Sequence, residues 1–239
     1  MVAVDWLERP LAAFDLETTG TDPEEDRIVT ASVALVGAGR EAEATDWLVD
    51  PGVEIPEKAT EVHKITTEMV RSEGRPPVEA VAEITELLAS YLNDDYPVVA
   101  FNARYDLTML DRESRRYGLE PLVEMVGGPT GLLVVDPLIL DKQIDPYRKG
   151  KRKLTDLCLH YGVELTEAHA AHADAVAAAR LAWRLGSSNP ELGELDLPTL
   201  HDNQVGWARE QAESLQRYFD GQGRNETVEA EWPLVSWSD

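Results

Sequence analysis

The order of the expected elements indicates an α/β fold, with a mixed β-sheet flanked by helices. The N-terminal fifth of the chain has the β-branched content of strands separated by turns. After it, segments with helical spacing alternate with short apolar runs that suit strands buried on both faces. Strands first, followed by alternating helices and strands, predict a sheet with both antiparallel and parallel neighbours.

Three strands are expected first, separated by turns at residues 20–26 and 37–39. The second turn contains glycines at both ends, and the segments on either side are rich in apolar and β-branched residues. This pattern predicts an antiparallel hairpin. The expected strands are the run that starts at Leu11, then Arg27–Val36, then Glu43–Val49.

Helices and buried strands follow. Pro77 suits the first turn of a helix, because its fixed φ fits there and the N–H that it lacks would have no partner. Gly118 and Gly162 are helix stop signals. The expected segments are a helix from Pro77 to about Leu92, a strand at Pro97–Phe101, a helix at Ala103–Tyr117, a strand at Leu132–Val135, and helices at Leu154–Tyr161, Ala170–Leu185 and Asp202–Phe219.

The composition changes after Gly186, where a linker of small and polar residues begins. The last part of the chain is acidic and rich in turns, and it contains Trp232 and Trp237. A chain of 239 residues can form one substantial core and an appendage. We therefore expect one domain at residues 1–186. Residues 187–239 would form a C-terminal linker, helix and acidic tail that packs on this domain or docks a partner.

The formal net charge of −23 disfavours tight wrapping of duplex nucleic acid, because counterion release requires clustered cations. The densest cationic segment is Arg148–Lys153, which is either a solvated loop or a phosphate contact. No apolar stretch approaches the ~20 residues that span a bilayer, so no membrane partner is expected. The start of the chain lacks the pattern of a secretory signal. The single cysteine, Cys158, suits a reducing compartment, and we expect a cytoplasmic protein.

Asp15 and Glu17 are the most informative pair of residues. They lie two positions apart near the end of the first strand, so both side chains point to the same side of the sheet. Two carboxylates at a half-buried strand end repel each other and lose hydration, and divalent cations would offset that cost. Taken alone, the pair also fits a solvated strand end that runs into a turn.

Two further segments place acids at the ends of elements. Asp106 follows an apolar run and lies in the first turn of a helix, and Asp174 opens the alanine-rich helix near His169 and His172. Each acid alone also fits interaction with the helix dipole. The three segments together, in this order and spacing, are far more specific than any one of them.

These segments resemble the three motifs of the DEDDh, or DnaQ-like, 3′–5′ exonucleases, a family that includes the proofreading (epsilon) subunit of bacterial DNA polymerase III. The motifs are Asp15-x-Glu17, Asn102-x-x-Tyr105-Asp106 and His169-x-Ala171-x-x-Asp174. Two other segments are similar to the family: Thr18-Thr19-Gly20 with Asp26–Val29, and Val62–Thr66, in which Lys64 replaces the usual glycine. The resemblance spans about Leu11 to Leu185. It implies a ribonuclease-H-like fold with a five-stranded mixed sheet.

The resemblance implies hydrolysis from a 3′ end to 5′-mononucleotides with two divalent metal ions, Mg²⁺ or Mn²⁺. Such ions prefer oxygen ligands, and a pair of them activates water and neutralises the leaving oxygen. By resemblance, Asp15, Glu17 and Asp174 bind metal directly, and Asp106 completes the site.

A general base is also implied, which is work suited to a neutral imidazole. The family's five-residue step from histidine to the last acid assigns this role to His169, with His172 as the rival. A sister group has tyrosine where this chain has Ala170, so that variant is excluded.

The resemblance further implies a pocket for the terminal nucleotide. Its expected lining is the backbone at Thr18 and Thr19, the side chain of His63, and Phe101 with Asn102. A partly exposed loop histidine is an equally good interpretation of His63.

The expected substrate is the 3′ end of single-stranded DNA, and a DNA polymerase or repair complex is a candidate partner. The first alternative is an RNA exonuclease of the oligoribonuclease or RNase T type that acts on short RNA. The second is a docking module in a replication or repair complex.

Overall fold

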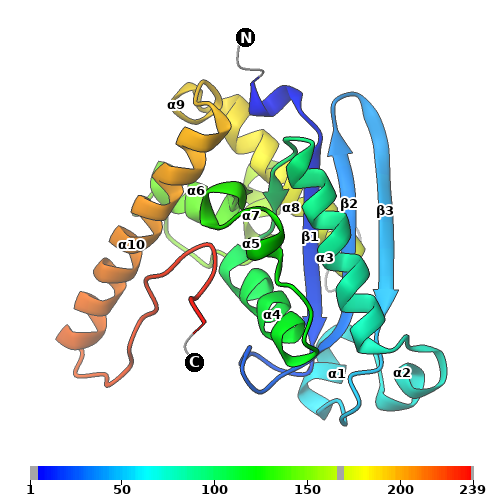
Figure 1. Ribbon diagram of the computed structural model, residues 1–239. Helices are drawn as coiled ribbons and strands as arrows, with labels where there is room; N and C mark the ends of the chain where they lie inside the picture. Colours follow the sequence, from blue (N-terminus) through cyan, green and yellow to red (C-terminus); the bar gives the residue numbers. More distant parts are fainter. Residues whose placement is uncertain (1–4, 166–169, 238–239) are drawn as a thin grey trace.

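A computed structural model describes residues 5–165 and 170–237 of the chain. Its centre is a five-stranded sheet in the order β3-β2-β1-β4-β5 (Figure 1). The strands are β1 (Leu11–Thr18), β2 (Ile28–Gly37), β3 (Arg40–Leu48), β4 (Val98–Val99) and β5 (Val134–Val135). The pairs β1–β2 and β2–β3 are antiparallel, whereas β1–β4 and β4–β5 are parallel. The predicted α/β fold with a five-stranded mixed sheet is confirmed.

Helices cover both faces of this sheet (Figure 1). One face packs against α3 (Pro77–Asn93), α4 (Ala103–Arg116) and α5 (Leu122–Met125); the other packs against α7 (Leu154–Tyr161) and α8 (Ala171–Ser188). Phe14 and Leu16 belong to the first core and Ala13 to the second, as the alternation of a strand requires. Asp15 and Glu17 are in step with Ala13 and therefore face α8.

Several predicted boundaries need correction. The parallel strands β4 and β5 have only two residues each, because the chain leaves the sheet early to enter α4 and α6 (Pro137–Ile144). The expected linker after Gly186 is also wrong in part, since α8 continues to Ser188 and a short helix, α9 (Pro190–Gly193), follows.

Two short helices between β3 and α3 were not predicted. They are α1 (Glu57–His63) and α2 (Thr67–Glu73). The second begins at Thr66, whose Oγ1 accepts a hydrogen bond from the Met69 N–H at 3.2 Å. Such a side-chain cap compensates for a length that is marginal for an isolated helix.

The last helix, α10 (Leu197–Gly221), starts before the predicted Asp202 because Asp196 caps it through the Thr199 N–H at 2.8 Å. It lies against the outer edge of β5. His201 Nδ1 accepts from the Val134 N–H at 3.1 Å, and the Gln204 amide donates to the Val134 carbonyl at 3.0 Å. These side chains replace a sixth strand by pairing backbone groups that would otherwise be buried without partners.

Within the described ranges, no helix is both long enough and apolar enough to cross a membrane.

Candidate active site

Three carboxylates from two elements meet on the α8 side of the sheet. Asp15 and Glu17 come from the end of β1, and Asp174 comes from the first turn of α8. One oxygen of each can be chosen so that all three lie within 4.8 Å of one another. Because all three are hard oxygen ligands, the set suits a divalent cation such as Mg²⁺ or Mn²⁺.

Asp106 lies beside this cluster and is bonded to the strand that carries it. Its Oδ1 accepts a hydrogen bond from the Leu16 N–H at 3.1 Å. The parallel pairing of β1 with β4 stops at Ala13–Val99, so a side chain takes over where the neighbouring strand has ended. Asp106 therefore fixes the backbone between the two acids of β1.

The cluster strongly favours protonated carboxyl groups when no cation is present. Burial raises the pKa of Asp15 well above its usual range, and the charges of Asp106, Asp174 and Glu17 add to the shift. Burial, with a contribution from Asp174, raises the pKa of Glu17 to about 7. Positive charge bound here would reverse both effects.

The two histidines of the third motif have different outcomes. His169 lies outside the described residues. His172 is half-exposed on α8, and its Nδ1 lies 4.0 Å from Asp46 Oδ1 on β3. Its imidazole therefore faces a carboxylate of the neighbouring strand.

A cavity of about 450 Å³ adjoins the acidic cluster. Its walls come from β2, β3 and the beginning of α8, and Glu17 and His63 lie on its border. His63 ends α1 and is only 7% exposed, so the interpretation as a partly exposed loop residue is wrong. Its Nδ1 accepts from the Ile65 N–H at 3.1 Å. Burial lowers the pKa of His63, although the nearby main chain of Thr18 opposes the shift, so the ring favours its neutral form.

The part of the chain that carries the acidic cluster matches a known protein family. The RNase T model, described as exonuclease, matches residues 12–182. The chain belongs to the RNase T family of DnaQ-like 3′–5′ exonucleases. The predicted resemblance to this family is thereby confirmed.

Sequence relatives of this exonuclease chain include much longer proteins. It is 29% identical, over 82% of its length, to the PolC-type DNA polymerase III of Halalkalibacterium halodurans. It is 30% identical, over 77% of its length, to the PolC-type DNA polymerase III of Staphylococcus aureus. These matches cover 13% and 12% of the two relatives, so the chain spans about an eighth of their length.

Solved structures with the same fold include two exonucleases I. The E. coli enzyme in complex with a dT13 oligonucleotide has a TM-score of 0.64 at 19% identity, over 78% of this chain and 43% of that one. The enzyme from Methylocaldum szegediense has a TM-score of 0.62 at 23% identity, over 88% of this chain and 46% of that one. At these identities, the similarity supports the fold.

In this exonuclease, Tyr105 organises the turn after β1. Its hydroxyl hydrogen-bonds both Thr18 Oγ1 and the Gly20 carbonyl oxygen, each at 2.6 Å. Thr19 Oγ1 donates to Asp26 Oδ1 at 2.8 Å within the same turn. The two threonine hydroxyls are thus engaged within the protein, and the role of the Tyr105 hydroxyl was not predicted from the sequence.

The remaining two predicted pocket residues lie at the start of α4, apart from the cavity of His63. Phe101 is half-buried and packs with the core on the α8 side. Asn102 has a left-handed backbone, with φ of 64°, and lines a separate small cavity with Arg104 and Lys142. The structure therefore brings Glu17 and His63 to one cavity and Asn102 to another.

A buried acid that sequence reasoning missed holds this region. Asp136 accepts hydrogen bonds from the N–H groups of Asn102 and Ala103, both at 3.0 Å, and from Leu138 at 2.9 Å. Trp232 Nε1 donates to it at 3.3 Å. The sequence signal for it is Asp136-Pro137 directly after a buried apolar run, a pattern typical of a helix start.

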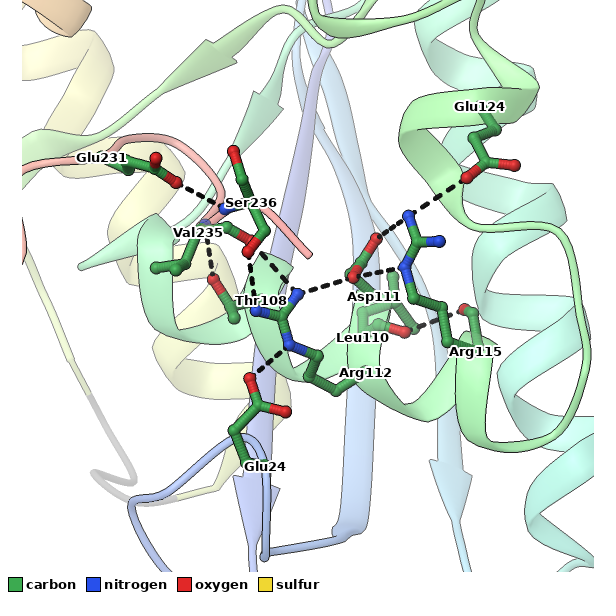
Figure 2. A network of polar contacts seen from close by, with 11 residues as sticks. Glu24, Thr108, Leu110, Asp111, Arg112, Arg115, Glu124, Glu231, Val235 and Ser236 are labelled. Atoms are coloured by element: carbon green, nitrogen blue, oxygen red, sulfur yellow. Dashed lines mark hydrogen bonds and ion pairs between the residues drawn. The ribbon is translucent and has the colours of Figure 1, made fainter. Parts of the chain in front are cut away.

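The C-terminal tail is tied to the turn after β1 through α4 (Figure 2). Arg112 Nε donates to Glu24 Oε1 at 2.6 Å, and its Nη1 donates to the Val235 carbonyl at 3.1 Å. The guanidinium also contacts Asp111 at 2.8 Å, and the ring of Trp237 lies 5.1 Å from it. Residues far apart in the sequence are therefore linked by one buried cation.

The cationic segment 148–153 divides into two sets. Arg148 and Arg152 turn inward to Asp141, which is fully buried and also accepts from the Tyr161 hydroxyl at 2.9 Å. The three lysines of the segment, Lys149, Lys151 and Lys153, are exposed. Two of the five cations are therefore structural, which the sequence alone did not reveal.

Proposed function

We propose that the chain removes 5′-mononucleotides from the 3′ end of single-stranded DNA in a reaction that requires divalent metal. The acidic cluster of Asp15, Glu17 and Asp174 carries the proposal, because three carboxylates within 4.8 Å are costly without cations. Membership of the RNase T exonuclease family supports the reaction type. The fold is shared with an exonuclease I in complex with a dT13 oligonucleotide, which favours DNA over RNA.

Two ions, Mg²⁺ or Mn²⁺, would be held by Asp15, Glu17 and Asp174, with Asp106 completing the site. When bound, the ions supply activation of water and stabilisation of the leaving 3′-oxygen. The raised pKa values of Asp15 and Glu17 fit this use, since a carboxylate cluster that resists ionisation alone is suited to hold dications. Asp106 contributes by holding the Leu16 main chain, which keeps the two acids of β1 in place.

His169 takes the proton from the attacking water in this proposal. The spacing of five residues to Asp174 supports the assignment, and His172 faces Asp46 instead. A neutral imidazole with a pKa near 7 is suited to the task.

The terminal nucleotide would occupy the cavity beside Glu17. In this proposal His63 and the main chain of Thr18 and Thr19 line its approach. Phe101 and Asn102 complete the set from the start of α4, where Asn102 lines a separate cavity. A neutral, buried His63 would present an uncharged ring to a base or sugar, without competing for the metal ions.

Residues 1–186 would form the nuclease domain, and residues 187–239 would pack on it. The hydrogen bonds of His201 and Gln204 to β5 support packing over docking. Association with a DNA polymerase or a repair complex is also proposed, on the basis of the PolC-type relatives.

The test is digestion of 5′-labelled single-stranded DNA, a matched RNA and circular single-stranded DNA, with Mg²⁺, Mn²⁺ or EDTA. We expect stepwise shortening of the linear DNA and release of mononucleotides only with metal. An Asp15→Asn preparation controls for contaminating nuclease. Nicking of the circle as the main activity would overturn the proposal, and faster digestion of RNA would favour the oligoribonuclease type.

A further inference from the structure

A cleft of about 490 Å³ lies between α6 and α10, away from the acidic cluster. Its lining is rich in hydrogen-bond donors, namely Lys142, Gln143, Arg152 and Ser214, with Glu210 as a carboxylate and Tyr218 as an aromatic ring. Lys142 and Gln211 also line the small cavity that contains Asn102. The cleft therefore continues towards the start of α4 and Asn102, one of the residues proposed to contact the terminal nucleotide.

Lys142 is half-buried and makes no hydrogen bond or ion pair with the described residues. Burial lowers the pKa of this ammonium, and Arg104 and Arg152 add to the shift, whereas Asp136 and Asp141 oppose it. A partly desolvated cation with cationic neighbours costs free energy. An anion in the cleft would offset that cost.

Two other groups line the cleft, namely the amide of Gln211 and the ring of Tyr218, which has the neighbouring Phe219 ring at a centroid distance of 6.2 Å. Gln211 donates from Nε2 to the Ile139 carbonyl at 3.2 Å, while its Oε1 is buried with no partner among the described residues. The ring of Tyr218 is 60% exposed. Along one groove the protein offers an acceptor, a cation and an open aromatic ring. These groups match the base edges, the phosphates and the base faces of a single-stranded nucleic acid.

We propose that this cleft binds the single strand on the 5′ side of the terminal nucleotide, with Lys142 next to a backbone phosphate and a base stacked on Tyr218. The inference rests on the proposed exonuclease function. It adds a subsite built by α10, a helix that lies outside the residues matched by the family model. The three exposed lysines of segment 148–153 follow α6 in the chain and would extend the same cationic path.

The test measures binding of 5′-fluorescein-labelled dT20 by anisotropy, in the Asp15→Asn background so that the strand is not digested. Lys142→Gln is expected to weaken binding and to reduce the slope of log affinity against log salt by ~0.7, the value for one phosphate contact on a single strand. Tyr218→Ala is expected to weaken binding at least ~5-fold, whereas Tyr218→Phe retains the ring and the affinity. Unchanged affinity in both Lys142→Gln and Tyr218→Ala would overturn the proposal.

A matched control and an opposite change sharpen the test. Arg217→Gln removes one cation from the same helix, where it pairs with Glu213 and lies outside the cleft lining, and it should leave affinity unchanged. Glu210→Gln removes a negative charge from the cleft and should tighten binding. Free dTMP or inorganic phosphate that competes as well as dT20 would overturn the strand path in favour of a small-anion site.

Cleavage of the dinucleotide dT2 separates this inference from the proposed function. Tyr218→Ala, made in the chain with Asp15 intact, should cleave dT2 at the unmodified rate. Loss of dT2 cleavage in this variant would contradict a subsite that acts only on longer strands. Absence of dT2 cleavage in the unmodified chain would count against the proposed function, while the dT20 binding result would still decide the cleft.

Discussion

The Leu16 N–H and the Asp106 carboxylate, 90 residues apart in the sequence, are joined by a hydrogen bond of 3.1 Å. Leu16 lies between the two acids of β1, so this bond positions both of them. The strand needs such a partner here because its parallel neighbour β4 has already ended. Because β4 is short, the Leu16 N–H can donate to Asp106 at the start of α4, and this bond holds the fourth acid beside the cluster.

Asp15→Asn is expected to abolish nuclease activity while preserving the fold. The substitution removes a proposed metal ligand, so the rate should fall by more than the ~100-fold typical of an outer-shell partner. It also removes a carboxyl group whose ionisation is opposed by burial and by three neighbouring acids. In EDTA the melting temperature should therefore rise. Activity within tenfold of the unmodified protein would contradict the assignment.

The metal-free protein should lose stability as the pH rises from about 4.5 to about 7. The pKa of Glu17 is raised to about 7 in the folded chain, against an ordinary value of 4.5, so the folded state holds more protons in this window. The free energy of unfolding then decreases with pH, as melting curves in EDTA would show. Glu17→Gln should flatten this dependence, and Glu61→Gln, an exposed change on α1, should leave it intact.

Added Mg²⁺ should reverse that trend. Because a cation competes with protons for the same carboxyl groups, the stabilisation by Mg²⁺ should grow as the pH rises. A melting temperature that rises with pH in EDTA would contradict the raised pKa of Glu17.

His169→Ala is expected to lower the rate by roughly 10²–10⁴-fold, the usual worth of a positioned general base. Metal binding should survive, since the proposed ligands are carboxylates, and titration of the melting temperature with Mn²⁺ would check this. His172→Ala serves as the control and should stay close to the unmodified rate, because its imidazole faces Asp46. The opposite ranking of the two variants would overturn the alignment of the third motif.

The fold and the acidic cluster followed from local sequence patterns. Strand alternation placed Asp15 and Glu17 on one side, and helix starts placed Asp106 and Asp174. Features that depend on distant partners were not predictable in this way. The helix-start pattern at Asp136 accounts for its bond from the Leu138 N–H, but its other donors, the N–H groups of Asn102 and Ala103 and the Trp232 ring, come from distant segments.

The cationic segment shows the same limit. Its composition indicated five equivalent charges, but the buried Asp141 selects Arg148 and Arg152 and leaves the lysines in solvent. Asp141 lies in α6, which precedes the segment in the chain, so the segment alone carries no sign of this division.

Neutralising Lys149, Lys151 and Lys153 with glutamine should weaken the binding of long single strands. The slope of log affinity against log salt should shrink by up to ~0.7 per lost phosphate contact. Cleavage of a dinucleotide should hardly change. Equal losses on long and short substrates would indicate damage to the site or the fold, and an unchanged slope would leave the lysines as ordinary solvated surface.

Lys64→Gly should stabilise the protein, since Lys64 ends α1 with a left-handed backbone, at φ of 65°, a conformation that favours glycine. A residue with a Cβ is strained in this conformation by about 1–2 kcal/mol, and the greater freedom of glycine in the unfolded chain cancels part of the gain. We expect the free energy of unfolding to rise by about 0.5–1 kcal/mol, measured by urea denaturation. Lys64→Ala loses the same long side chain and its hydrogen bond to the Glu61 carbonyl but keeps the Cβ, so it should give no gain. A gain in the alanine variant equal to that in the glycine variant would show that the side chain, and not the backbone of α1, is the source of the strain.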